Sequence, residues 1–211
     1  MRHLLAIPLA AILLVSPATE AQVDYFPPGI LDEISRSSKF REHWYSENLT
    51  ALKEPSLWEL SKTQKSQTYR FLWLRSFNRP ISVRLDINAD GSSIVTAKAA
   101  NGHGGSNPGK LVMKKTRVLT KQDTDYVLDR FKELGFWDLP THEKPQVSIG
   151  ADGEEYAQIN LEGAQWILEG VKDGNYHIVD RWSPENGATR TLGILLLINI
   201  ANLKLLYEEV Y

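Results

Sequence analysis

Strict alternation of apolar and polar residues marks a short segment in the middle of the chain. Ile81, Val83, Leu85 and Ile87 alternate with polar residues, which is the pattern of a strand buried on one face. Further strand-like segments span residues 68–74, 93–98, 110–119, 156–161, 165–170 and 176–182. Turns that combine Asn or Asp with Gly separate several of these segments. The sequence therefore predicts an antiparallel sheet of six or seven strands.

A helical period appears in two segments after the fourth strand. Thr120 followed by Asp123 is a helix-start signature, and apolar residues then recur at helical spacing, which predicts a helix over 121–134. Gly135 suits the left-handed residue just past a helix end. The segment 189–207 is apolar on nearly every side, which predicts a buried helix that packs on the sheet. An outer face that contacts a second copy or a partner is the alternative reading of that helix.

Irregularly spaced apolar residues between positions 30 and 62 predict two or three short helices, with a boundary just before Pro55. We expect residues 22–64 to form a small helical N-terminal cap and residues 65–211 to form the main domain. The predicted fold class is α+β, with a capped middle helix and a C-terminal helix packed on an antiparallel sheet.

The first 21 residues have the features of a secretory signal peptide: a basic Arg2, an apolar run over 4–15 and small residues before Gln22. The run is too short to span a bilayer. The chain contains no Cys, which excludes disulfide-rich folds, thiol catalysis and lipid attachment at a cysteine. We therefore expect a soluble periplasmic or secreted protein that is not a lipoprotein and has no membrane span.

Charge and composition narrow the possible partners. The chain has 24 Lys and Arg against 26 Asp and Glu, a net charge of −2, and no basic block, so neither nucleic acid nor an anionic membrane is an expected partner. With 42% hydrophobic and 24% charged residues, the proportions are those of an ordinary globular domain.

Two motifs resemble known binding sites but lack essential parts. Residues 86–91 match the first half of an EF-hand loop, yet the twelfth position is Ala97 where a calcium site needs Glu, so a polar hairpin turn is the better interpretation. The glycine-rich segment 102–109 contains His103 but fits neither a phosphate loop nor a serine-hydrolase elbow. It is interpreted as a long hairpin loop, with a ligand or partner loop as the alternative. No His residues stand at ligand spacing, so neither a metal nor a cofactor is expected.

The hairpin over 166–182 concentrates the residue types that carry chemistry. A two-residue turn at 173–174 would place Trp166 opposite Arg181, whereas a three-residue loop would place Glu169 opposite His177. In the second register the carboxylate could orient the imidazole as a general acid/base pair. The sequence is compatible with both registers, and the main interpretation of the hairpin is structural: a cross-strand polar pair and an Arg stacked on Trp.

Three segments of the sequence, at residues 71–75, 135–140 and 166–184, resemble segments of a group of exported proteins from Gram-negative bacteria. No activity is assigned to that group. The resemblance covers most of residues 68–207. It implies a periplasmic location and carries no chemistry.

Function is expected to be non-catalytic binding in the cell envelope, as in an inhibitor, an immunity protein or an assembly accessory. The candidate surface for a protein partner consists of Trp166, Arg181, Trp182 and His103. The first alternative is a small periplasmic hydrolase that uses Glu169 and His177 under the 102–109 loop. The second is a structural homodimer formed through the C-terminal helix.

Overall fold

The computed structural model describes residues 23–31, 38–63, 67–105, 107–143, 147–149, 155–157, 162–205 and 210–211. The signal peptide expected over 1–21 lies outside these residues.

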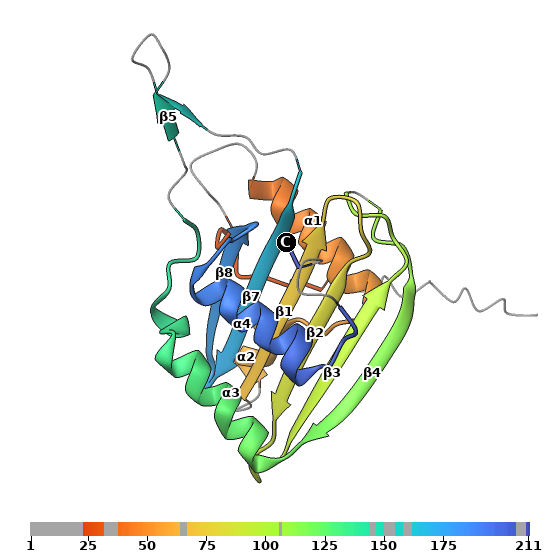
Figure 1. Ribbon diagram of the computed structural model, residues 1–211, viewed down its shortest axis with the longest axis vertical. Helices are drawn as coiled ribbons and strands as arrows, with labels where there is room; N and C mark the ends of the chain where they lie inside the picture. Colours follow the sequence, from red (N-terminus) through yellow and green to blue (C-terminus); the bar gives the residue numbers. More distant parts are fainter. Residues whose placement is uncertain are drawn as a thin grey trace, which may run out of the picture.

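One antiparallel sheet organises the chain (Figure 1). Its strands are β1 (Gln67–Arg75), β2 (Ile81–Ile87), β3 (Ser93–Ala100), β4 (Leu111–Leu119), β7 (Ala164–Lys172) and β8 (Asn175–Trp182), in the order β4-β3-β2-β1-β7-β8. The predicted α+β class and the six-stranded antiparallel sheet are confirmed. At residues 88–91 the chain makes the tight β2–β3 turn expected from the incomplete calcium motif.

A second, two-stranded sheet pairs β5 (Val147–Ile149) with β6 (Glu155–Ala157). The strand expected over 156–161 therefore begins in β6, but β6 pairs with β5 and not with the large sheet. A three-residue strand such as β5 is too short to produce a readable alternation, which is why its pairing with β6 was not predicted.

Helices cover both faces of the large sheet. Figure 1 shows α3 (Lys121–Glu133) and α4 (Gly187–Ile194) in front of it, and α1 (Ser38–Ala51) and α2 (Leu57–Thr63) behind it. A short 3₁₀ turn, η1 (Phe136–Asp138), follows α3, and a π-helical segment, η2 (Leu195–Ile200), continues α4. The α1–α2 break falls at Pro55, as predicted.

Each face of the sheet has its own apolar core. On the α3/α4 side, aromatic residues of β1 and β7, among them Phe71 and Trp166, pack with the helices. On the other side Leu72 and Ile167 pack against the N-terminal residues, including Tyr45. The central strands are thus buried on both faces, which explains why β1 and β7 are nearly continuous apolar runs.

Both ends of α3 have the predicted caps. The Thr120 hydroxyl accepts the Asp123 amide at 3.0 Å, and Gly135 adopts φ of 62° just past the helix. Phe136 then folds back, with its ring centroid 5.2 Å from that of Phe131.

The C-terminal helix packs on the sheet as predicted, but its predicted extent over 189–207 is wrong. The helical segment stops at Ile200, and Asn202 has a left-handed φ of 49°. Lys115 and Arg117 of β4 donate to the backbone carbonyls of residues 200–202. Because those side chains satisfy the last carbonyls, the chain can leave the helix while later leucines still pack on the core. Within the described ranges, no helix is long and apolar enough to cross a membrane.

Candidate functional site

The hairpin of β7 and β8 has the two-residue register. Trp166 pairs with Arg181, and Glu169 pairs with Ile178 instead of His177. Neighbouring residues of a strand point to opposite faces, so Glu169 and His177 lie on opposite sides of the sheet. The acid/base pair required by the hydrolase alternative is therefore not formed.

Glu169 belongs to a fully buried ion pair on the α1 side of the sheet. Its Oε2 atom lies 2.7 Å from Nε and 2.5 Å from a terminal nitrogen of Arg70, and its Oε1 atom accepts the Tyr176 hydroxyl at 2.9 Å. Burial raises the pKa of Glu169, although Arg70 acts to lower it. Burial alone would lower the pKa of Arg70, but the carboxylates of Glu169 and Glu54 outweigh it and raise that pKa.

Glu54, in the α1–α2 connection, extends this network across the sheet. Its carboxylate lies 2.7 Å from Lys98 Nζ, 3.2 Å from Arg84 Nε and 3.8 Å from a terminal nitrogen of Arg70. Arg70 and Arg84 stand directly opposite each other on β1 and β2. Two cations in that position repel each other, so the Glu54 carboxylate between them offsets a repulsion built into the sheet.

On the opposite face His177 packs against aromatic rings. Its ring centroid lies 5.1 Å from that of Phe136 and 5.9 Å from that of Trp137. Burial lowers the pKa of His177 and outweighs the backbone hydrogen bonds at Leu139 and Phe136 and the Asp138 carboxylate, which act to raise it. His177 is therefore a packing residue among aromatic rings, on the face of the sheet opposite Glu169.

Two of the predicted surface residues are structural. Trp166 has no exposed area and donates its indole N–H to the Tyr211 carbonyl at 3.0 Å, so the expectation that Trp166 contacts a partner is corrected. The arginine over its ring is Arg190, at 5.6 Å, in place of the expected Arg181. Arg181 is also buried and donates to the Pro140 and Thr141 carbonyls. Both positions were misread because exposure cannot be deduced from residue type.

Asp180 forms a cluster that sequence reasoning missed. Its carboxylate accepts the Tyr45 hydroxyl at 3.0 Å and the Gln165 amide, with His142 Nδ1 at 3.9 Å and Arg41 at 3.7 Å. Burial raises the pKa of Asp180. These partners come from three separate parts of the chain, α1, β7 and the segment around His142, so no spacing in the sequence could bring them together.

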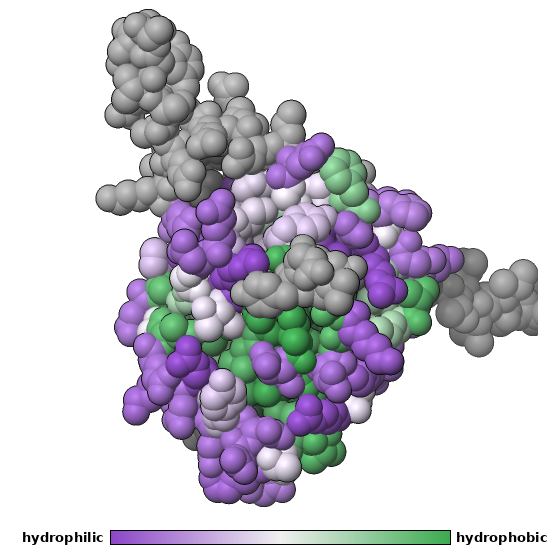
Figure 2. Space-filling view, viewed as in Figure 1, coloured by the Kyte–Doolittle hydropathy of each residue, from purple (hydrophilic) through white to green (hydrophobic). Residues whose placement is uncertain are grey.

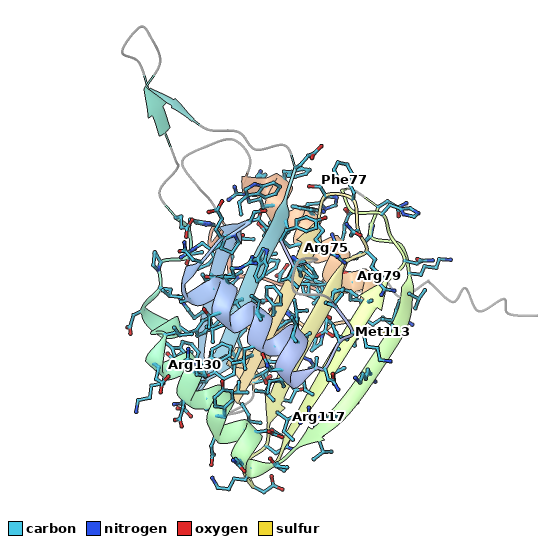
Figure 3. The ribbon with its side chains drawn as sticks, viewed as in Figure 1. Arg75, Phe77, Arg79, Met113, Arg117 and Arg130 are labelled. Atoms are coloured by element: carbon cyan, nitrogen blue, oxygen red, sulfur yellow. The ribbon has the colours of Figure 1, made fainter. Side chains whose placement is uncertain are left out.

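The other two predicted residues, Trp182 and His103, lie at one end of the sheet, the end reached by β1, β3 and β8. Trp182 is half-buried at the last position of β8, and His103 is exposed in the β3–β4 loop. The β1–β2 turn reaches the same end and carries Phe77 at its tip (Figure 3). Helix α1 adds Phe40 and Trp44.

Contacts join the segments that carry these residues. Phe40 stacks on Trp44 with centroids 6.0 Å apart, and Trp44 donates its indole N–H to the Gly105 carbonyl at 2.6 Å. A side chain at Gly104 would meet the backbone carbonyls at Arg75 and Ser76, so the 102–109 loop lies tightly against the β1–β2 turn. We call the surface formed by Phe40, Trp44, Phe77 and His103 the aromatic end.

The aromatic end leaves large apolar side chains in solvent. Phe77 is 67% exposed and Phe40 is 62% exposed. Arg79, also exposed, flanks Phe77, while Arg75 is buried and lies 4.0 Å over the Trp73 ring. Aromatic and arginine side chains of this kind are enriched where proteins bind other proteins.

The α3/α4 face has two clefts with less distinctive linings. One, of about 390 Å³, runs between α3 and α4 and includes Tyr126, Arg130 and Arg190. Arg130 pairs with Glu133 at 2.6 Å, and Arg190 donates to backbone carbonyls. The other, of about 280 Å³, lies beside η1. Figure 2 shows polar side chains around the apolar centre of this face.

In the described part of the chain, no group of three or more His, Asp or Glu side chains is placed to hold a metal ion. Comparison of the chain with protein-family models, curated proteins and solved structures finds no match to any of them.

Proposed function

We propose that this protein is a non-catalytic binding domain of the bacterial cell envelope that captures another protein through the aromatic end. The observation that carries the proposal is the exposure of two phenylalanine rings, Phe40 and Phe77, near one end of the sheet. The partner it requires presents apolar pockets for two aromatic rings.

Burial of the two exposed rings by a partner would supply a useful amount of binding free energy. Fully burying a phenylalanine side chain contributes about 1.5–3 kcal/mol, so two rings on one surface supply a substantial part of a micromolar affinity, which corresponds to about 8 kcal/mol. The neighbouring β3–β4 loop is held to α1 by the Trp44–Gly105 hydrogen bond and lies close to the β1–β2 turn at Gly104. An ordered surface loses less entropy on binding.

The buried polar residues support a binding role over a catalytic one. Glu169 and Asp180 are enclosed by side chains that hydrogen-bond or pair with them inside the fold. A general acid or base must reach the proton that it transfers in a bound substrate. Neither carboxylate lines either of the two clefts.

The proposal is tested by capture from an envelope extract of the source organism. The protein is purified in the form that its host exports and is immobilised in parallel with Phe77→Ser and Phe40→Ser variants and a Tyr126→Ser control. Retained proteins are identified by mass spectrometry. Tyr126 is 55% exposed on α3, so its replacement by Ser also removes an exposed aromatic ring, but from a different surface. We expect one protein retained by the wild type and the control but lost from both phenylalanine variants.

Equal retention by all four proteins, or no specific retention at all, would contradict the proposal. Because Phe40 and Phe77 are exposed, their substitution should leave the unfolding temperature within about 1–2 °C of the wild type. That measurement separates loss of the surface from loss of the fold.

A further inference from the structure

Strand β4 is an open edge of the large sheet. It has nine residues, it pairs with β3 along one side, and no described element pairs with its other side (Figure 1). Exposed Val112 and Val118 lie near its two ends.

The direction of its backbone groups follows from the ladder. The Ala100 amide bonds to the Pro80 carbonyl, toward β2, whereas the Asn101 amide bonds to the Lys110 carbonyl, toward β4. Backbone groups alternate in direction along an antiparallel strand, so the odd-numbered residues of β3 face β4. Their partners are Met113, Lys115 and Arg117.

The residues between those partners have backbone groups that point away from the sheet. Lys114, Thr116 and Val118 therefore present N–H and C=O groups along the outer edge, at the spacing that another strand would match. Each of the three side chains is exposed, and Val118 is 70% exposed.

The charge of this edge has one sign. Lys114, Lys115 and Arg117 lie within β4, which contains no acidic residue. Arg117 pairs with Asp123 at 2.9 Å and, with Lys115, points over the face that holds η2. Figure 3 shows Arg117 and Met113 along β4. Lys114 projects on the opposite face, so an added strand would meet cations on both of its sides.

The same charges disfavour pairing of β4 with a second copy of the chain. A two-fold antiparallel pair centred on Lys115 places that lysine opposite itself. Centring the pair on Thr116 places Lys115 opposite Arg117, and centring it on Arg117 places that arginine opposite itself. Like charges directly opposite each other destabilise a strand pair. The charges of β4 thus disfavour these pairings with a second copy and favour the addition of an acidic strand.

We propose that the outer edge of β4 binds an extended acidic segment of a partner protein by strand addition. Main-chain hydrogen bonds to Lys114, Thr116 and Val118 supply the binding, and a carboxylate opposite Lys114 supplies the selectivity, since Lys115 already donates to the carbonyls of residues 201 and 202. This goes beyond the proposed function, because it concerns a separate surface and holds even if the aromatic end binds nothing.

The test uses a fluorescent nine-residue peptide of alternating valine and glutamate, with the full-length protein, and measures fluorescence anisotropy. A peptide with lysine in place of glutamate is the charge control. Two further glutamate peptides are the backbone control: one is N-methylated on its odd-numbered amides and the other on its even-numbered amides. Only one of these two phases removes the N–H donors that strand addition needs. We expect binding of the glutamate peptide that weakens between about 50 and about 300 mM salt, no binding of the lysine peptide, and loss of binding in one methylated phase only.

Variants at the edge complete the test. Thr116→Pro removes an outward N–H without removing a ladder bond, since proline is tolerated where that N–H faces solvent, and it should abolish peptide binding; Thr116→Val should retain it. Lys114→Glu should weaken binding about tenfold or more. Phe77→Ser should leave peptide binding unchanged, which separates this result from the aromatic end. Equal binding of both methylated peptides, equal binding of the lysine peptide, or no binding of the glutamate peptide would overturn the proposal.

Discussion

Replacement of Arg70 by methionine is expected to be the most destabilising single change in the buried ion network. Methionine fills much of the same space but leaves Glu169 with the Tyr176 hydroxyl as its remaining described partner, and it leaves the Pro55 carbonyl without the Arg70 donor at 2.6 Å. Breaking a buried pair by removing one partner costs about 3–5 kcal/mol. For urea slopes of about 2–3 kcal/mol per M, the unfolding midpoint should fall by roughly 1–2.5 M.

The double variant Arg70→Met with Glu169→Leu separates the value of the pair from the cost of an orphaned charge. Replacing a whole buried pair by apolar residues is often neutral or stabilising. Here Tyr176 loses an acceptor, which costs about 1 kcal/mol. We therefore expect the double variant to be more stable than Arg70→Met alone and to lie within about 2 kcal/mol of the wild type.

Urea titrations at pH 7, followed by tryptophan fluorescence and circular dichroism, measure both free energies of unfolding. The buried indoles of Trp73 and Trp166 report on the core beside this sheet. An Arg70→Met cost below about 1 kcal/mol, or a double variant no more stable than the single one, would refute the reasoning. The first result would mean that water reaches the pair, and the second that packing, and not charge, dominates.

Two further predictions concern the α3/α4 side of the sheet. Burial lowers the pKa of His177 below its ordinary 6.5, so its contribution to stability is complete above pH 6.5 and is lost as the pH falls through the folded-state pKa. In urea titrations from about pH 8 down to about pH 5, His177→Gln should therefore gain stability relative to the wild type as the pH falls. A difference between the two proteins that does not change with pH would contradict the burial argument. A methyl group at Gly193 would lie 2.5 Å from the Trp166 ring, so Gly193→Ala should cost about 1–3 kcal/mol in the same assay despite alanine's better helix propensity, whereas Thr191→Ala on the exposed side of α4 should change little.

Local sequence patterns predicted most of the fold. Alternation located β2, the Thr120 cap located α3, and the Asp-Gly turn at 173–174 located the β7–β8 hairpin, although its register was left open between two alternatives. These features depend on residues close together in the sequence. The end of the C-terminal helix was misjudged because its last carbonyls are satisfied by Lys115 and Arg117, about 85 residues earlier in the chain.

The candidate site was harder to predict, because exposure depends on the whole fold. Trp166 and Phe77 are both aromatic residues near a strand end, yet the first is in the core and the second is in solvent. One signal for the ion network was present in the sequence. Arg70 interrupts an apolar strand expected to be covered on both faces, and a cation in that position has to be paired.

The ion network also explains why the N-terminal residues belong with the sheet. On the α1 side, the sheet places three cations, Arg70, Arg84 and Lys98, near two carboxylates, Glu169 and Asp86. The missing negative charge is the Glu54 carboxylate, which comes from the connection between α1 and α2.

Glu54 therefore does more than fill a space, because without it two opposed arginines would share a buried face with too little negative charge. The same N-terminal segment carries Phe40 and Trp44 on α1. Fixing Glu54 among three cations holds one end of that helix against the sheet, and the Trp44–Gly105 hydrogen bond holds its side to the β3–β4 loop. The buried charges thereby help to set the position of the exposed aromatic rings on which the proposed binding function depends.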